Sequence, residues 1–357
     1  MSKYNITEWT CGIGLMSGTS LDGIDLALCS FRLNNNKWEY NIDEAITYQY
    51  DEKIRKMLMQ MPQMSGSELM IADRKLGKYY GELILNFLRT THKKPEFIAS
   101  HGHTIFHEPK MGMTFQAGHG ASIAAETEIP VICDFRSSDV ALNGQGAPLV
   151  PIGDKLLFEE FDALVNLGGF ANISKEDSNK RIAFDICPVN IVFNHYARKT
   201  VCDFDKDGML AAKGNPNPEL LTKLNNLSYY SEPYPKSLGR EWVEKTFLPI
   251  IEKSKVESIN DILSTLVIHA VNQITQSTKH NKKILFTGGG VKNKFLIENL
   301  RKELKDSIVI PNETIIDFKE AMVFAFMGWL RLNDLPNTIS SATGASKSTS
   351  AGAVYIP

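Results

Sequence analysis

The sequence has little that would crosslink, metallate or anchor a protein. Its five cysteines are scattered without the C-x-x-C spacing of a zinc or redox site, and no stretch reaches the roughly 18 apolar residues of a membrane helix. The opening MSKYNITEWT contains no apolar core of a secretory signal. Lys and Arg number 39 against 41 Asp and Glu, a net charge of -2, which disfavours nucleic acid and anionic membranes as partners. These absences predict a reduced, cytoplasmic protein without a structural metal.

Strand and helix patterns alternate along the chain, which indicates an α/β class. With 357 residues the chain has room for two domains and can bury roughly 75% of its unfolded surface. The Gly- and Pro-rich stretch 144–151 is the expected crossing between the domains and the candidate hinge. The first domain is therefore expected at 1–143 and the second at 144–339. The tail 340–357 has the option of returning to the first domain. Helices are expected over 67–91, 121–127, 190–201, 240–253, 259–280, 293–305 and 318–332, and short strands at 97–100 and 131–134.

Two glycine turns of one type are the most informative motif. The first spans residues 16–23 and the second residues 166–172, and each lies between two strand patterns. In P-loop and dinucleotide-binding motifs the glycines lead from a strand into a helix, so these turns differ from both. Glycine permits positive φ and lets backbone N–H groups converge on an anion. Ordinary hairpins use the same residues and bind nothing, so either turn alone leaves both interpretations open.

A third glycine element favours the phosphate interpretation. A short apolar strand at 283–287 is followed by Gly288, Gly289 and Gly290, and a helix then begins with Asn293 as its expected N-cap. A strand, three glycines and a helix give flat backbone on which a base or a ribose can lie. Three glycine elements in this order predict a nucleotide held between two similar domains.

Several longer sequence blocks occur together with these turns. They are GLMSGTSLDGIDLA from Gly14, SHGHTIFHEP from Ser100, DFRSSDVALNGQGAPLVP from Asp134, NLGGFANIS from Asn166, FDICPVN from Phe184, DKDG from Asp205, PKSLGRE from Pro235, GGGVKN from Gly288 and TGAS from Thr343. In these blocks the chain resembles the anhydro-N-acetylmuramic acid kinases of the acetate kinase, hexokinase and actin superfamily. The resemblance runs from about residue 12 to the C-terminus, and it is specific because the blocks have no other reason to co-occur.

The resemblance implies a fold and an activity. The fold would be α/β, with two ribonuclease-H-like domains of the actin/hexokinase type and an interdomain cleft. The activity would be an ATP-dependent phosphorylation of O6 of 1,6-anhydro-N-acetylmuramic acid, in which water opens the anhydro ring at C1, as a step of peptidoglycan recycling. ATP, Mg²⁺ and the sugar are then the expected ligands, with neither nucleic acid nor membrane as partner. A homodimer is implied as one option.

The catalytic carboxylate that the resemblance implies is Asp185, after a strand pattern at 181–184. The residues alone also permit Asp185 to cap a helix turn beginning near Asn190. In this block the family usually has Thr, Gly and Gly where the chain has Ile186, Cys187 and Val189, so the backbone path is expected to change. Two alternatives therefore stay open, a kinase for another (anhydro)sugar and a non-catalytic sugar- or nucleotide-binding regulator. Cys187 is interpreted as a packing residue.

The expected sugar contacts are polar side chains of the first domain and Asn190. Arg136 suits the lactyl carboxylate of the sugar because a guanidinium donates two parallel hydrogen bonds. An ion pair of Arg136 with an Asp such as Asp139, shaping the hinge, is the equal alternative. His101 and His103 are candidates for touching the sugar. The close spacing of the histidines gives no support to a Mg²⁺ site, since Mg²⁺ prefers oxygen ligands.

The expected nucleotide contacts are the three glycine elements. In the first turn Asp22 and Asp25 have two interpretations, ordering a Mg²⁺-bound water or satisfying turn amides, and the metal ligands stay unassigned. The roles of the DKDG and PKSLGRE blocks are left open by the sequence. The predicted nucleotide-binding residues are Gly18, Thr19, Ser20, Leu21, Asp22, Gly23, Ile24, Asp25, Gly168, Gly169, Asn172, Gly288, Gly289, Gly290 and Asn293.

Overall fold

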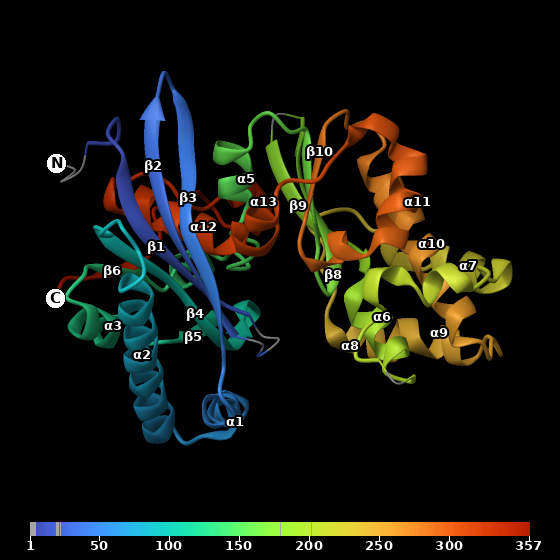
Figure 1. Cartoon of the computed structure of the whole chain (residues 1–357), viewed down its shortest axis with the longest axis horizontal. Helices are drawn as coiled ribbons and strands as arrows, with labels where there is room; N and C mark the ends of the chain where they lie inside the picture. The colour runs from blue at the N-terminus through green and yellow to red at the C-terminus, as the bar shows by residue number, and fades with distance from the viewer. Residues whose placement is uncertain (1–4, 19–20, 22, 179, 201) are drawn as a thin grey trace. The chain divides into compact units, whose positions relative to one another are not determined.

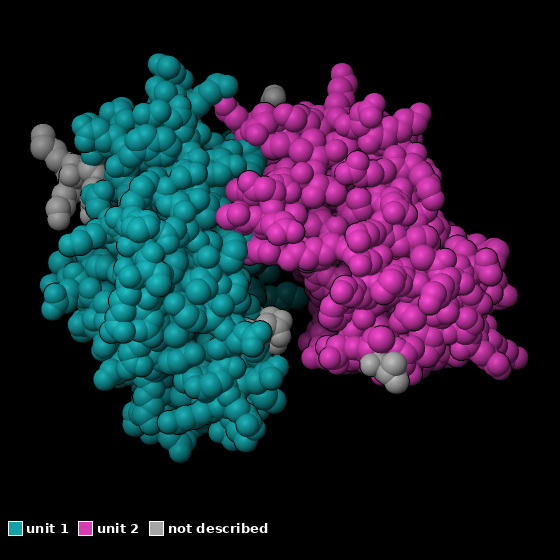
Figure 2. All heavy atoms as spheres, viewed as in Figure 1, with its two compact units in different colours: residues 1–158, 318–357 teal, residues 159–317 magenta. Residues whose placement is uncertain are grey.

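The computed structural model describes residues 5–18, 21, 23–178, 180–200 and 202–357. Two compact units divide the chain (Figure 2): unit 1 is Met1–Phe158 together with Phe318–Pro357, and unit 2 is Glu159–Asp317. Unit 2 is thus inserted into unit 1 along the sequence. No helix among the described residues is long and apolar enough to cross a membrane.

The sheet of unit 1 begins with an antiparallel meander of β1, β2 and β3 (Figure 1). Strand β4 pairs parallel to β1, and β6 pairs parallel to β4. The last strand, β12, closes the edge antiparallel to β6, and β5 forms a hairpin with β4. The strands are β1 (Thr10–Ser17), β2 (Gly23–Asn34), β3 (Lys37–Gln49), β4 (Phe97–Glu108), β5 (Met113–Ala117), β6 (Val131–Cys133) and β12 (Ala353–Tyr355).

The sheet of unit 2 repeats this connectivity. Its strands are β7 (Ala163–Leu167), β8 (Phe170–Asp177), β9 (Lys180–Pro188), β10 (Ile284–Thr287) and β11 (Ile308–Val309), in the order β11-β10-β7-β8-β9. The first three form an antiparallel meander, and β10 and β11 follow parallel to β7. Five strands correspond between the units: β1, β2, β3, β4 and β6 in unit 1, and β7 to β11 in unit 2. Across each sheet they lie in the order third, second, first, fourth, fifth. In each unit only the second of the five is antiparallel to the others. This is the ribonuclease-H-like order, so the predicted α/β fold with two such units is confirmed.

Helices cover both faces of the unit 1 sheet. One face carries an aliphatic cluster in which Leu76 and Tyr80 of α2 pack on strand residues such as Leu15. On the other face Phe31 lies 5.3 Å from Phe326 of α12, ring centre to ring centre. The described helices here are α1 (Glu52–Gln60), α2 (Gly66–Leu88), α3 (Gly120–Thr127), α4 (Ser137–Ala141), α5 (Pro151–Leu157), α12 (Glu313–Leu332) and α13 (Ser340–Thr343); α12 enters unit 1 at Phe318.

The core of unit 2 joins its sheet to the long helix α10. Buried residues of α10, among them Leu266 and Ala270, share one apolar cluster with Val165 and Ile173 of the central strands. The helices are α6 (Asn190–Ala197), α7 (Pro218–Asn225), α8 (Arg240–Trp242), α9 (Leu248–Glu252), α10 (Ile259–Thr278) and α11 (Lys294–Leu304), with a π-helical turn Val243–Phe247 between α8 and α9. This π turn interrupts the helix expected over 240–253.

The boundaries between the units differ from those expected. Residues 144–158 and 318–339 belong to unit 1, and the chain crosses at 158/159 and again at 317/318. The stretch expected to be a hinge is instead tied into unit 1: Gly144 N–H donates to the carbonyl of Asp139 (2.9 Å), and Gln145 N–H to that of Thr343 (2.8 Å). These bonds leave the Gly- and Pro-rich segment inside unit 1 and not at a crossing.

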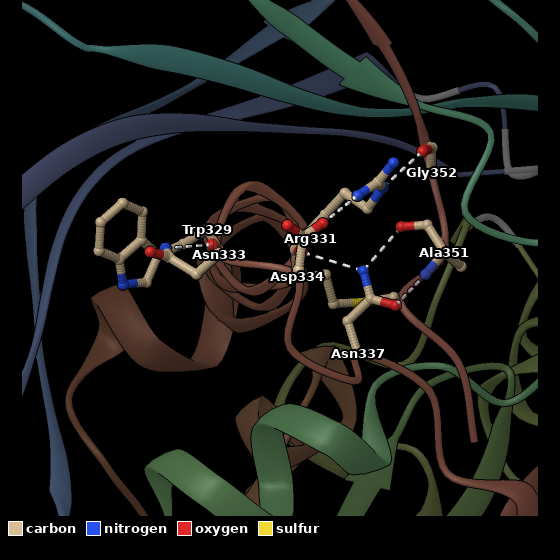
Figure 3. Close-up of polar contacts among 8 residues, drawn as sticks. Trp329, Arg331, Asn333, Asp334, Asn337, Ala351 and Gly352 are labelled. Atoms are coloured by element: carbon tan, nitrogen blue, oxygen red, sulfur yellow. Dashed lines mark hydrogen bonds and ion pairs between the residues drawn. The ribbon is translucent and has the colours of Figure 1, made fainter. Parts of the chain in front are cut away.

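The C-terminal tail is fastened to α12 by one buried amide (Figure 3). Asn337, which is 0% exposed, donates through Nδ2 to the carbonyls of Met327 (3.0 Å) and Ala351 (2.8 Å). Its Oδ1 accepts the N–H of Ala351 (2.7 Å), so the side chain pairs with the tail as a neighbouring strand would. Arg331 adds a bond from Nε to the carbonyl of Gly352 (2.9 Å). The tail thereby reaches β6.

Candidate functional site

The first glycine turn joins β1 to β2 in unit 1. Thr19, Ser20 and Asp22 lie outside the described residues. Leu21 has a φ of 60° and donates its N–H to the carbonyl of Gly18 (3.4 Å). Gly23 is required by close packing, because a Cβ there would lie 2.3 Å from the carbonyl oxygen of Tyr48. At its described residues the loop is therefore tightly packed.

The two residues after this turn lie on β2. Ile24 is fully buried, so it contributes to the core and can offer a ligand only its backbone. The carboxylate of Asp25 accepts a hydrogen bond from the hydroxyl of Thr47 on the adjacent strand (2.6 Å). That bond satisfies one oxygen of Asp25 through a side chain of the neighbouring strand.

A buried hydrogen-bonded chain supports the turn from within unit 1. His103 Nδ1 is 2.8 Å from Oγ of Ser17, the last residue of β1. The hydroxyl of Tyr50 donates to the same Ser17 oxygen (2.6 Å) and lies 3.0 Å from the hydroxyl of Tyr80. Burial lowers the pKa of His103 to about 4, so its ring is neutral at physiological pH. Through its contact with Ser17, His103 therefore supports the start of the turn from the interior of unit 1.

His101 and Arg136 form a second polar pair of unit 1. Arg136 donates from Nε (3.0 Å) and Nη2 (2.8 Å) to Nε2 of His101, and from Nη1 to the carbonyl of Gly146 (2.5 Å). Nδ1 of His101 lies 2.9 Å from the carbonyl of Gly102, which assigns the proton to Nδ1. Burial, followed by the Arg136 charge, holds the pKa of His101 well below its ordinary value. The structure therefore brings these two predicted sugar-contact residues into direct contact, and the imidazole of His101 is neutral.

Asp139 has an internal role. It is 0% exposed, and its two oxygens accept hydrogen bonds from Gly146 N–H (2.8 Å) and from the Thr343 hydroxyl (2.7 Å). A Cβ on Gly144 would lie 2.1 Å from Asp139 Oδ2, which explains the glycine there. The expected sugar contact of Asp139 is therefore replaced by a structural link between the 144–146 loop and the C-terminal segment.

Glu320 is a carboxyl group of this region that the motif analysis missed. It lies on α12, one turn before Phe324, whose ring is 4.5 Å from that of His101. Burial raises the pKa of Glu320, and the charges of Lys319, Asp25 and Arg136 all act on it. Its sequence signal was a single acidic residue directly before the apolar run at 321–327.

The second glycine turn joins β7 to β8 in unit 2. Gly168 N–H donates to the carbonyl of Phe170 (3.1 Å), so this N–H is used within the turn. A Cβ on Gly168 or Gly169 would meet nothing closer than 3.6 Å or 3.9 Å, and neither φ is in the left-handed region. These two glycines therefore do not use the positive φ that glycine permits. They leave open space above the turn, which is the property a ligand needs.

Polar side chains form a row across the sheet of unit 2. Asn172 on β8 pairs with Asn166 on β7 and with Asp185 on β9, and Asn166 pairs in turn with Thr287 on β10. Residues paired across strands point to the same face. The row starts at Asp185 and ends where Gly288, with a φ of 82°, begins the triple-glycine segment. Asn166 begins the second turn motif but was not predicted as a contact, and Thr287 was missed because it is a single polar residue in an apolar strand.

Asp185 lies in the last part of β9 and is held by the PKSLGRE segment. Its Oδ2 accepts the N–H of Leu238 (2.8 Å), and its own N–H donates to the carbonyl of Lys236 (3.3 Å). The hydroxyl of Tyr229 donates to the Asp185 carbonyl (2.6 Å), and Lys236 Nζ donates to the Tyr229 carbonyl (2.8 Å). Burial raises the pKa of Asp185. The segment whose role the sequence left open therefore positions this carboxylate.

The departures from the family pattern are core residues. Ile186, Cys187 and Val189 are at most 2% exposed, and burial raises the pKa of the Cys187 thiol, which fits packing and not nucleophilic chemistry. The helix-cap interpretation of Asp185 fails, because Val189 occupies the N-cap of α6 and no side chain caps it. Asn190, the first residue of α6, donates to the carbonyl of Leu167 (3.4 Å).

The triple-glycine segment leads into α11 as predicted. Asn293 is the N-cap, and its Oδ1 accepts the N–H of Leu296 (3.0 Å). A Cβ on Gly289 would meet nothing within 4 Å, whereas one on Gly290 would lie 2.7 Å from Leu167 Cβ. Gly208 of the DKDG block packs against the Asn293 side chain, so this block supports the start of α11.

These features define a class of protein. Two ribonuclease-H-like sheets, each with a glycine turn between its first two strands, and a buried carboxylate at the end of a strand beside the second turn are the arrangement of two-domain proteins of the actin and hexokinase type.

The comparison with known families makes the assignment particular: the chain belongs to the anhydro-N-acetylmuramic acid kinase family, whose model matches residues 10–357. The anhydro-N-acetylmuramic acid kinase of Hydrogenovibrio crunogenus is 36% identical over 365 residues, covering 97% of this chain and 98% of that protein. The enzyme of the same name from Francisella tularensis subsp. novicida is 36% identical over 370 residues, covering 95% and 97%.

Proposed function

We propose that this protein is an ATP-dependent anhydro-N-acetylmuramic acid kinase of peptidoglycan recycling, as its full-length relatives are named. The proposal rests mainly on the environment of Asp185. This residue has a raised pKa, it has one hydrogen bond from Leu238 on Oδ2, and it ends a polar row that leads to the triple glycine. Since ATP is a cytoplasmic nucleotide, the proposal places the enzyme in the cytoplasm.

In the proposed reaction Asp185 takes a proton from water as the water oxygen forms a bond to C1 of the sugar. The C1–O6 bond breaks, and O6 forms a bond to the γ-phosphoryl group of ATP, which leaves ADP. A carboxylate whose pKa is raised toward the working pH is a better proton acceptor than an ordinary Asp. Leu238 N–H and the Tyr229 hydroxyl hold the base in one orientation. Gly168 and Gly169 leave open space for the nucleotide.

The proposed reaction includes Mg²⁺. The described residues contain no group of three or more His, Cys, Asp or Glu placed to hold a metal. Mg²⁺ bound together with ATP needs only one or two carboxylates besides phosphate and water oxygens. Asp25 beside the first turn fits that requirement, since its carboxylate has an oxygen chemistry that suits Mg²⁺. The ion would neutralise phosphate charge.

The test is ADP release from ATP–Mg²⁺ with and without 1,6-anhydro-N-acetylmuramic acid. We expect sugar-dependent turnover to the 6-phosphate, and a loss of at least about 100-fold in kcat for Asp185→Asn, which keeps the size of the side chain but not the base. Asp177→Asn is the matched control, because Asp177 also lies in the unit 2 sheet but is bonded to Tyr234 and Ser178 away from the row. Wild-type protein that binds the sugar without releasing ADP would refute the proposal.

A further inference from the structure

A polar cavity of about 160 Å³ lies within unit 1, on the α2–α3 side of its sheet. Its lining comes from Asp73 of α2, residues 100–102 of β4, residues 114–116 of β5, the start of α3, the segment after β6 and Tyr355 of β12. On this measure one water needs only about 10–15 Å³, so the cavity has room for a larger group. The residues 100–102 and Asp134 belong to two of the quoted sequence blocks, but the motifs did not predict a cavity.

Ser100 is the first sign that the cavity receives a ligand. The residue is 0% exposed, lines the cavity, and its Oγ makes no hydrogen bond within the described part of the chain. A buried hydroxyl without a partner disfavours folding, so buried polar groups are rarely left in this condition. A partner supplied by a bound molecule would remove the cost.

Gln116 gives a second, independent sign. Its Nε2 donates to the hydroxyl of Thr114 (2.8 Å), which orients the amide, and its Oε1 is buried without a partner among the residues described. The cavity thus offers a hydroxyl that can donate or accept and a carbonyl oxygen that can only accept. A ligand with its own hydroxyl or amide N–H would satisfy both.

The charges around the cavity exclude an anionic ligand group. Asp73 and Asp134 are both lining residues, and no Lys or Arg of the described chain lines it. Asp73 accepts the N–H of Gly118 (2.7 Å), and Asp134 accepts the hydroxyl of Ser137 (2.5 Å). A carboxylate or a phosphate placed here would be repelled by these two groups. The rings of Phe115 and Tyr355 supply apolar surface.

We propose that this cavity binds an uncharged, hydroxyl- or acetamido-bearing part of the sugar substrate, with Ser100 Oγ and Gln116 Oε1 as its hydrogen-bond partners. The inference rests on the proposed function and adds to it a sugar-binding cavity within unit 1, which His101 helps to line. The negatively charged part of the sugar would stay with Arg136, outside the cavity.

The test compares Ser100→Ala with Ser264→Ala. Ser264, on α10 of unit 2, is also 0% exposed with an Oγ that lacks a partner among the described residues, but it does not line the cavity. Both variants remove an unsatisfied hydroxyl, so we expect both to raise Tm by about 2 °C or more. Only Ser100→Ala should raise KM for 1,6-anhydro-N-acetylmuramic acid, by about three- to tenfold, with KM for ATP unchanged.

An active Ser100→Ala enzyme with the wild-type KM for the sugar would overturn the inference and leave the proposed function intact. If the wild type neither binds nor phosphorylates this sugar, the proposed function fails, and the cavity is then tested by the Tm shift that N-acetylmuramic acid, N-acetylglucosamine and glucose produce. The inference stands if the wild type responds and Ser100→Ala does not. It falls if the two respond alike or if no sugar shifts the wild type.

Discussion

The ion pair of Lys319 and Asp154 should be worth far more to unit 1 than a surface pair. Lys319 Nζ lies 2.7 Å from Asp154 Oδ1, and the two side chains are only 6% and 5% exposed. Lys319 Nζ also lies 5.5 Å from the centre of the Phe158 ring. Both residues stand next to the points where the chain leaves and re-enters unit 1, at 158/159 and 317/318.

The expected magnitude follows from the burial of both charges. At 2.7 Å their attraction is about 6 kcal/mol for an effective dielectric constant of about 20. Much of this offsets the loss of hydration, so replacing the whole pair is close to neutral, whereas removing one partner costs about 3–5 kcal/mol. We therefore expect Lys319→Met and Asp154→Leu each to lower the free energy of unfolding by about 3–5 kcal/mol. The double variant should return to within about 1 kcal/mol of wild type.

Hydrogen exchange is the appropriate assay, because a chain with two units does not unfold in one step and amide exchange reports each unit separately. The free energy of opening is taken from the buried amides of β1 and β4 in unit 1, with β7 of unit 2 as the internal control. Additive costs in the double variant, or a cost under about 1 kcal/mol for either single variant, would refute the argument that this pair is desolvated.

Three further predictions follow from other contacts. Asp185→Asn should raise the free energy of unfolding near neutral pH. Burial raises the native pKa of Asp185 above its unfolded pKa, so wild-type stability falls as pH rises between these two values. The gain should vanish below the ordinary pKa of about 3.9, and a pH-independent gain would contradict this. Asn337→Ala removes three hydrogen bonds and should lower Tm, with an unfolding cost of about 2–4 kcal/mol in denaturant titrations; unchanged tail protection from exchange would contradict it. Gly14→Ala should prevent folding, since its Cβ would lie 1.8 Å from the Ala321 carbonyl oxygen, whereas Gly169→Ala should fold normally; circular dichroism separates the two outcomes.

Local patterns in the sequence predicted several helices of both units, but not α1, α5 or α7. The helices near 67–91, 121–127, 259–280 and 293–305 are present with shifts of one to three residues at their ends, and Asn293 is the N-cap. The strand expected at 97–100 is longer, because β5 pairs with its second half and draws the histidine block into β4. Pairing between strands is a tertiary effect that a local pattern does not contain.

The residues that position the site were harder to predict. Asp185 was found through its motif, but Leu238, Tyr229 and Lys236 reach it from about 50 residues further along the chain. Asp139 shows the opposite error: a charged residue in a conspicuous motif is fully buried and bonded to Thr343, which lies 204 residues away. Spacing along the chain gives no information about such contacts, because they exist only once distant segments pack together.

The insertion of unit 2 into unit 1 fixes an order of events during synthesis on the ribosome. Unit 2 is contiguous, so Glu159–Asp317 can fold as soon as it emerges. Unit 1 must wait for α12 to cover Phe31 and Phe97, and for β12 to pair with β6. Until α12 has emerged, the nascent chain therefore carries an uncovered apolar sheet, and until β12 pairs, the edge of β6 stays open to aggregation.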